Sequence, residues 1–283
     1  MSLKTIETYS SMLRRFMATR DPLQCSRDDI RDYVDEMRNG GLRSKTMSLR
    51  LSCLSSFWEW LVWEGLADEN PVPPIRKRYM SVYKETGDRQ THKIISVSEA
   101  ARLIDCAVDI RDKSLITMLL KTGIRLDEAR MLDIDSIRWN DWSLLLNATK
   151  KRSNRIVYFD DEAAGLLKRW LSVREHRSEL PGGPIWTTGS YRRISPRGVD
   201  FVVRRAAISA GLNDQSSPRM EDHFSPHCCR HWFTTHLLRN GMPREYVKEL
   251  RGDARTEAID IYNHIDREDL RRRYLACIPQ LGV

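Results

Sequence analysis

The chain has 283 residues, 41% of them apolar, which is enough for two domains that each bury a core. Lysine and arginine number 47 against 39 aspartates and glutamates, and the net charge of +8 favours a polyanionic partner, either nucleic acid or an anionic membrane surface. No stretch approaches the length of a membrane-spanning apolar segment, and the first residues are polar where a signal peptide requires an apolar run, so we expect a cytoplasmic protein.

Residues 1–75 have the pattern of a small helical bundle. The first apolar residues recur at helical spacing and predict an amphipathic helix: Ile6, Tyr9, Leu13, Phe16 and Met17. A second helix should follow Ser26, because Ser26 and Asp29 have the spacing of a capping pair. A third helix with a wide apolar face should begin at Ser44 and end at Gly65.

A linker is expected at residues 76–92, in a stretch without periodicity that begins near residue 71. The sequence Asn70-Pro-Val-Pro-Pro74 disfavours a continuing helix, and the residues up to Thr91 are polar and basic. Arg76, Lys77 and Arg78 would suit a strap across a phosphate backbone, and equally a solvated charge run. The chain would therefore divide into domains at residues 1–75 and 93–283.

Residues 93–283 are expected to be mainly α-helical with a small β-sheet. Two short strands, at 142–147 and 155–159, should form a hairpin around the basic turn 150–154. Periodicity and capping signals predict helices, one of them holding Tyr262, and the others at 96–106, 114–121, 127–132, 160–174, 196–210, 227–239, 243–250 and 267–277.

The six cysteines show no paired spacing and are expected to be reduced. A metal site made of Cys228, Cys229, His227 and His231 fails on spacing, because no C-x-x-C pair or H-E-x-x-H motif is present. Arg230 in their midst would also repel a cation. Since no G-x-x-x-x-G-K-[ST] loop is present either, we expect chemistry without metal, nucleotide or other cofactor.

The sequence His227-Cys-Cys-Arg230-His231 places three polar side chains on one face of a predicted helix. Arginine offers a planar fork of donors that matches phosphate oxygens, and histidine adds a proton acceptor near neutrality. The motif therefore predicts an anion site with a base beside it. The alternative is that His227 packs or caps while Arg230 forms an interhelical salt bridge.

A second cationic motif is Thr122-Gly-Ile-Arg125-Leu-Asp-Glu128. Arg125 follows a glycine break, where a helix start directs backbone donors and a guanidinium at one anion. Glu128 has the spacing to orient Arg125 through a carboxylate pair. An ordinary loop followed by a capped helix would have the same pattern.

Four motifs in this order resemble the tyrosine recombinases, also called phage-type integrases, and in particular the Xer-type recombinases. They are the segment 122–128, Lys150 ahead of Arg155-Ile-Val, the segment 225–231 with Thr234-Thr-His-Leu-Leu, and Tyr262-Asn-His264. The resemblance covers nearly the whole chain. It implies an N-terminal SAM-like core-binding domain and a C-terminal catalytic domain that form a clamp around DNA.

The resemblance also implies the reaction and its residues. The reaction is site-specific cutting and rejoining of DNA strands through a 3′-phosphotyrosyl intermediate, in integration and excision or in dimer resolution. Two arginines would hold the phosphate, a histidine would accept a proton, a lysine would protonate the leaving oxygen, and a tyrosine would be the nucleophile. These roles fall on Arg125, Arg230, His227, Lys150 and Tyr262. Lys150 stands five residues before Arg155, as in the family's hairpin, and the neighbouring Lys151 is the alternative.

One position departs from the family pattern. Gly252 is followed by Asp253, where family members usually carry a histidine or a tryptophan. An ionised carboxylate would repel the scissile phosphate unless it is protonated or paired, and Arg251 and Arg255 are candidate partners. We expect Asp253 to occupy the catalytic site. The substitution leaves open a catalytically weakened DNA-binding relative, and the wider family leaves open a DNA-relaxing topoisomerase of tyrosine type.

The expected partner is double-stranded DNA with a specific target site, bound by a homotetramer associated with the nucleoid, whereas the protein free of DNA should be a monomer or dimer. The family often passes its final helix to an adjacent subunit in a ring of four, whereas docking of that helix within one chain is the alternative. Tyr246 and Tyr274 lie near the C-terminus but fit the nucleophile spacing less well than Tyr262. Phosphate contacts are expected from basic residues of both domains: Lys45, Arg50, Lys151, Arg192, Arg193, Arg197, Arg204 and Arg205.

Overall fold

The computed structural model describes residues 3–85, 93–147, 154–175, 182–217, 219–253 and 265–283. The chain divides into two compact units, residues 1–89 and 90–283. The described residues are mainly helical with one small sheet, as the sequence predicts. Within them, no helix combines the length and the apolar character needed to cross a bilayer.

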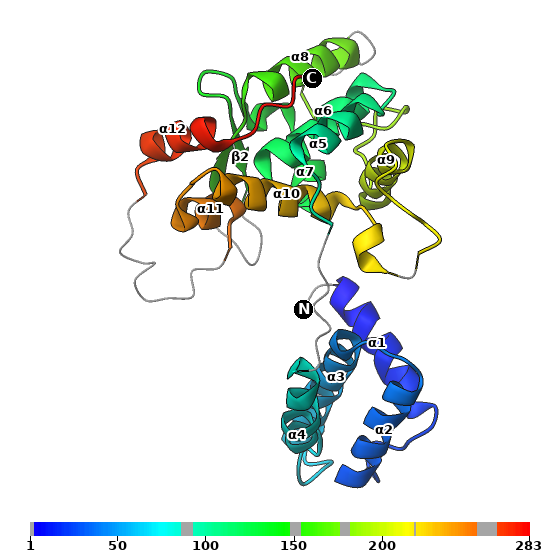
Figure 1. Cartoon of the computed structure of the whole chain (residues 1–283). Helices are drawn as coiled ribbons and strands as arrows, with labels where there is room; N and C mark the ends of the chain where they lie inside the picture. Colours follow the sequence, from blue (N-terminus) through cyan, green and yellow to red (C-terminus); the bar gives the residue numbers. More distant parts are fainter. Residues whose placement is uncertain (1–2, 86–92, 148–153, 176–181, 218, 254–264) are drawn as a thin grey trace. The chain divides into compact units, whose positions relative to one another are not determined.

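The first unit is a helical bundle around an aromatic core (Figure 1, blue to cyan). Phe16 meets the rings of Tyr33 and Trp58 edge to face, with ring centroids 5.0 and 5.6 Å apart. The predicted capping box is present, since the Ser26 side chain accepts from the backbone of Asp29. The helices are α1 (Leu3–Met17), α2 (Arg27–Asn39), α3 (Ser44–Trp63) and α4 (Val72–Glu85).

Helix α4 corrects the predicted linker, which was wrong for residues 76–85. The two prolines at 73 and 74 stand in the first turn of α4, where a missing N–H leaves no helical hydrogen bond unmade. Asn70 fixes the start, because its Oδ1 accepts from Val72 N at 3.0 Å and its Nδ2 donates to Ser55 O at 3.0 Å. Val72 and Met80 are buried in the bundle. The rest of the expected linker, residues 86–92, lies outside the described residues.

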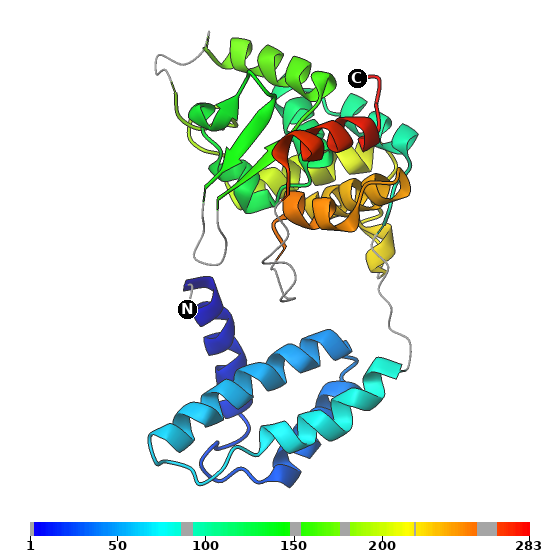
Figure 2. The same cartoon turned by 90° about the vertical axis from the view of Figure 1, so that its left-hand side faces the viewer.

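The second unit is mostly helical and carries a three-stranded antiparallel sheet at one side (Figure 2). The sheet has the order β1 (Ile137–Arg138), β2 (Ser143–Leu146) and β3 (Arg155–Tyr158). The predicted hairpin of β2 and β3 is confirmed, with Leu146 paired to Arg155. The helices are α5 (Val97–Asp105), α6 (Ile110–Thr122), α7 (Leu126–Met131), α8 (Asp161–Glu175), α9 (Pro196–Ser209), α10 (Pro226–Arg239), α11 (Arg244–Arg251) and α12 (Arg267–Cys277).

Helix α6 is the centre of this unit, buried from residue 114 to its end and packed against α8 and α10. Gly123 ends it in a left-handed conformation, with φ of 60°. A Cβ at Gly123 would lie 2.3 Å from the Phe233 ring, so both the backbone angle and the packing require glycine. The chain thereby leaves α6 close against α10 and reaches Arg125 two residues later.

Helix α12 and the C-terminal tail dock on their own unit (Figure 1, red). Tyr274 is buried and its hydroxyl donates to Lys121 O at 2.8 Å. The buried ammonium of Lys121 donates to Pro279 O at 2.7 Å and to Glu162 at 2.6 Å. Of the two arrangements considered for the final helix, this single chain has the intramolecular one.

Candidate active site

Arg230 is held rigidly inside the second unit. It lies in α10 with 3% of its side chain exposed, donating to Gly123 O at 2.7 Å and to Arg251 O at 2.7 Å. Burial, aided by the nearby charge of Arg251, lowers the pKa of Arg230 to about 10. The guanidinium therefore stays protonated at neutral pH, and little solvent remains to screen its charge.

Arg125 reaches the same place from the start of α7. Its backbone N–H donates to Glu128 Oε2 at 2.7 Å, and its Nη1 donates to Arg251 O at 3.0 Å. Glu128 Oε1 lies 3.4 Å from the same Nη1, so the expected orientation of Arg125 by Glu128 is confirmed. Residues 125–128 therefore form a capped helix start that also positions the Arg125 guanidinium.

Arg155 supports this arrangement from strand β3. It grips Glu128 with two hydrogen bonds of 2.9 and 2.8 Å, and its Nε donates to Leu250 O at 3.1 Å. Sequence reasoning used Arg155 only as a position marker and gave it no role. The available signal was an arginine at the start of an otherwise apolar strand, because an arginine is buried only when it is paired.

Gly252 brings Asp253 into the arginine cluster. Helix α11 ends there with φ of 60°, and a Cβ at Gly252 would lie 2.8 Å from the Arg155 guanidinium carbon. Asp253 Oδ1 lies 3.1 Å from Arg230 Nη2 and 3.4 Å from Arg125 Nη2. Asp253 Oδ2 lies 3.1 Å from Arg251 Nε. The expected pairing with Arg251 is confirmed, while Arg255 lies outside the described residues.

The structure thus brings together Arg125, Arg230 and Asp253 from three separate segments. His227 is exposed in the first turn of α10, one turn before Arg230, and its ring meets that of His231 edge to face at 4.6 Å. Three predicted site residues lie outside the described residues: Lys150, Lys151 and Tyr262.

Two other tyrosines near the C-terminus have hydroxyls committed to structural hydrogen bonds. Burial raises the pKa of Tyr274, whose hydroxyl is fixed to Lys121 O. A hydrogen bond to Asp269 at 2.6 Å raises the pKa of Tyr246. A raised pKa makes a phenol a poorer nucleophile at neutral pH.

The predicted DNA-contacting residues fall into two groups. Lys45, Arg192 and Arg197 are exposed, and Arg50 is half-buried on α3. The other three arginines of the second unit have intramolecular partners, which are Arg130 O at 2.8 Å for Arg193, Asp200 at 2.7 Å for Arg204 and the buried Asp112 at 2.8 Å for Arg205. We therefore expect the first group to be the stronger source of phosphate contacts.

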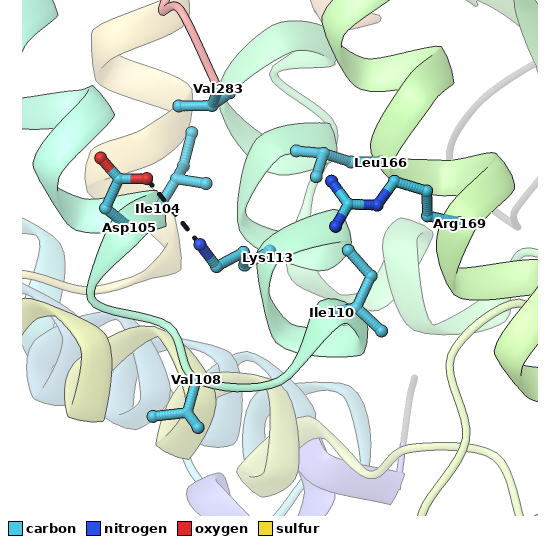
Figure 3. Close-up of a pocket in the computed structure, with 8 residues that line it drawn as sticks. All are labelled: Ile104, Asp105, Val108, Ile110, Lys113, Leu166, Arg169 and Val283. Atoms are coloured by element: carbon cyan, nitrogen blue, oxygen red, sulfur yellow. Dashed lines mark ion pairs between the residues drawn. The ribbon is translucent and has the colours of Figure 1, made fainter.

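Two hollows lie elsewhere on the second unit. An open groove of about 610 Å³ runs beside α9, lined by Leu126, Arg197 and Phe201 among others. A smaller cavity of about 170 Å³ lies between the end of α5 and the start of α6, where Asp105 and Lys113 form an ion pair of 3.8 Å near Arg169 (Figure 3). None of the four candidate catalytic residues that the structure describes, Arg125, His227, Arg230 and Asp253, lines the smaller cavity.

The guanidinium groups of Arg125, just before α7, and Arg230, in α10, converge beside a small sheet. On this fold, that arrangement defines an enzyme of the tyrosine recombinase class. The sequence model of the Phage integrase family matches residues 88–269, and the chain belongs to this family. The model of the Phage integrase N-terminal SAM-like domain matches residues 1–65, within the helical bundle. The resemblance inferred from four motifs is confirmed.

Curated relatives extend over most of the chain. Tyrosine recombinase XerC of Alcanivorax borkumensis is 29% identical over 259 residues, which cover 89% of this chain and 79% of the relative. Tyrosine recombinase XerC of Shigella flexneri serotype 5b is 28% identical over 261 residues, covering 91% and 82%.

Solved structures share the fold at lower identity. The Tn1549 transposon integrase in complex with transposon right end DNA has a TM-score of 0.74 at 15% identity, covering 96% of this chain and 93% of that one. The lambda integrase dimer bound to a COC′ core site has a TM-score of 0.69 at 15% identity, covering 94% and 93%. XerA recombinase has a TM-score of 0.52 at 21% identity, covering 99% and 94%.

Proposed function

We propose that this chain cuts and rejoins DNA strands at a specific target site through a 3′-phosphotyrosyl intermediate. The observation that carries the proposal is the convergence of Arg125 and Arg230 on one carbonyl and one carboxylate, which forms an anion site from distant parts of the chain. Preorganised positive charge of this kind stabilises the negative charge on the oxygens of a five-coordinate phosphorus in the transition state.

In the proposed reaction, Tyr262 Oη attacks the scissile phosphorus and its proton passes to His227. The bond from phosphorus to the 5′ oxygen breaks, and Lys150 protonates the departing oxygen. Arg125 and Arg230 hold the two non-bridging oxygens throughout. Attack by the 5′ hydroxyl of a partner strand then reverses these steps and releases the tyrosine. The phosphodiester energy is retained in the enzyme–DNA bond, so resealing needs no ATP. The proposed steps also use no metal ion.

Both units would bind the duplex, the first as a core-binding domain and the second as a catalytic domain, and together they would act as a clamp around DNA. The net charge of +8 and the exposed Lys45, Arg192 and Arg197 support this. The Tn1549 and lambda integrases, which share the fold, were solved on DNA. We further propose a homotetramer on DNA, located at the nucleoid.

The proposal is tested with a nicked duplex drawn from the DNA that flanks the gene, on which a cleaved strand cannot be resealed. Wild type should give a covalent protein–DNA adduct on a denaturing gel, and Tyr262→Phe should give none. Tyr274→Phe is the matched control, since it removes a phenol hydroxyl fixed in a structural bond and should retain the adduct. An adduct that persists in Tyr262→Phe would show that another residue is the nucleophile.

Asp253 within the arginine cluster favours one second candidate, a DNA-binding relative with weakened catalysis. That candidate predicts a gel shift with the same duplex and no adduct from wild type. A tyrosine-type topoisomerase would instead relax any supercoiled plasmid, so relaxation without dependence on the target site would replace the recombinase proposal.

A further inference from the structure

The Asp253 carboxylate lies where an anionic ligand of the arginine cluster would be expected. One of its oxygens contacts both Arg230 and Arg125, at 3.1 and 3.4 Å, and the other contacts Arg251 at 3.1 Å. A carboxylate and a phosphodiester each present one negative charge on two exposed oxygens, and the guanidinium fork binds both in the same way.

We propose, building on the proposed recombinase function, that Asp253 is a resident competitor for the scissile phosphate. In the DNA-free chain its carboxylate fills the position between Arg125 and Arg230, and the phosphate must displace it to bind. Asp253 is then a positioning residue that opposes premature anion binding, and the family's usual histidine or tryptophan would lack this property.

The cluster would keep its shape when the carboxylate leaves. Arg230 retains Gly123 O and Arg251 O as acceptors, and Arg125 retains Arg251 O. Both guanidinium groups would thus remain aimed at the vacated position. The site pays no reorganisation after the exchange, which is the condition for effective charge stabilisation.

The Asp253 carboxylate can leave its position between Arg125 and Arg230 without losing every partner. Its side chain is 31% exposed, and it follows Gly252, whose left-handed conformation marks the end of α11. The contact with Arg251 is made by Oδ2, whereas the contacts with Arg125 and Arg230 are made by Oδ1. A small rotation of the carboxylate away from Arg125 and Arg230 leaves it paired with Arg251.

The second carboxylate of the cluster is unsuited to this exchange. Glu128 is 13% exposed and is gripped by both terminal nitrogens of Arg155. With Glu128 and Asp253 in place, the cluster still holds two more positive than negative charges, so charge alone admits a phosphate. Its positive members are Arg125, Arg155, Arg230 and Arg251.

The test measures anion binding by the full chain, with tungstate as a tetrahedral oxyanion, from the shift of the thermal unfolding midpoint with concentration. Asp253→Asn keeps the shape and removes the charge, and should bind tungstate at least about tenfold more tightly than wild type. Asp253→Ala should show the same direction, which guards against an effect specific to the amide. The same variants should half-saturate the nicked duplex at lower protein concentration.

Two controls locate the effect. Asp133→Asn removes a carboxylate from another arginine pair of the same unit, with Arg193, and should leave tungstate affinity unchanged. Arg230→Lys combined with Asp253→Asn should abolish the gain. Tungstate affinity of folded Asp253→Asn and Asp253→Ala at or below the wild-type value would overturn the proposal.

The outcome separates from that of the proposed function, because tungstate binding does not require Tyr262. If wild type forms the adduct and neither Asp253 variant gains affinity, the competitor proposal fails and the recombinase stands. If both variants gain affinity and no protein forms an adduct, the anion competition stands and the recombinase proposal fails.

Discussion

Arg125 and Arg230 donate to the same main-chain oxygen, the carbonyl of Arg251, at 3.0 and 2.7 Å. The carbonyl therefore fixes the separation of two cations that would otherwise repel each other. It also ties the end of α11 to α7 and α10. The spacing of the anion site depends on backbone geometry as much as on the arginines themselves.

The first prediction concerns Arg230→Lys. Lysine keeps the charge but has a single nitrogen, which cannot serve Gly123 O, Arg251 O and an incoming phosphate in the fixed directions of a guanidinium. Strand cleavage of the nicked duplex should fall about 100-fold or more. DNA binding by gel shift should fall much less, because it draws on many phosphate contacts.

Arg239→Lys provides the matched control for this change. Arg239 lies in the last turn of the same helix and is exposed, so its replacement should leave cleavage and binding unchanged. Cleavage by Arg230→Lys at the wild-type rate would remove the directional argument.

The second prediction concerns Gly252→Ala. A left-handed conformation costs a non-glycine residue about 1 kcal/mol. Gly211→Ala should lose only that amount, since Gly211 has φ of +68° and open space where the Cβ would stand. Gly252→Ala should lose more, because its Cβ also meets the guanidinium of Arg155 at 2.8 Å. Urea unfolding of both variants gives the comparison, and cleavage should fall only in Gly252→Ala.

The sequence was sufficient for the described helices other than α4, for the hairpin and for the family, because their signals are local. Ser26 with Asp29, the break at Gly123 and the strand flanking Arg155 are each readable within a few residues. The linker prediction failed because Pro73 and Pro74 were read as helix breakers, although a helix tolerates proline in its first turn.

The detailed site was beyond sequence reasoning, because it depends on contacts between segments far apart. Motif order placed Arg125 and Arg230 in one site, and the charge of Asp253 indicated a nearby arginine. Nothing local indicated that Arg251 would contribute its carbonyl to both arginines, or that Arg155 would take Glu128 as its partner. These contacts are set by how α7, α10, α11 and β3 pack.

The third prediction concerns the pair of Arg155 and Glu128, which are 7% and 13% exposed. Glu128→Gln leaves a buried guanidinium without its counter-charge and should cost about 3 kcal/mol of unfolding free energy. The double variant with Arg155→Met should cost less than the sum of the single changes, with a coupling of about 1–3 kcal/mol. Guanidinium chloride unfolding of the four proteins measures this cycle.

The exposed pair of Arg130 and Asp127 on α7 is the control cycle, and its coupling should be below about 0.5 kcal/mol because solvent screens it. Equal couplings in the two cycles would mean that burial does not strengthen the Arg155 pair.

The fourth prediction separates DNA-contacting arginines from structural ones. Arg197 is exposed, and Arg197→Gln should reduce the slope of log binding constant against log salt by about 0.9, as expected for one lost phosphate contact. Arg193 instead donates to Arg130 O and pairs with Asp133, so Arg193→Gln should lower the unfolding midpoint and leave the slope unchanged. Gel shifts at a series of salt concentrations test both. A reduced slope for Arg193→Gln alone would reverse the assignment.

The last prediction concerns the C-terminal tail and acid. Burial acts to raise the pKa of Glu162, but hydrogen bonds from Lys121 and from the backbone N–H groups of Leu281 and Gly282 outweigh it and lower that pKa below 4.5. A carboxylate with a lowered folded-state pKa stabilises docking fully above its unfolded value, and this contribution is lost as pH falls through the folded-state pKa. Hydrogen exchange at the Leu281 and Gly282 amides should therefore show protection at neutral pH that disappears in acid below pH 4.5.

Glu162→Gln should lower the protection at neutral pH and remove the acid step, whereas Glu175→Gln, at the exposed end of the same helix, should change neither. The same contacts would have to break before the tail could dock on a neighbouring subunit. An acid step that survives in Glu162→Gln would show that another titrating group holds the tail.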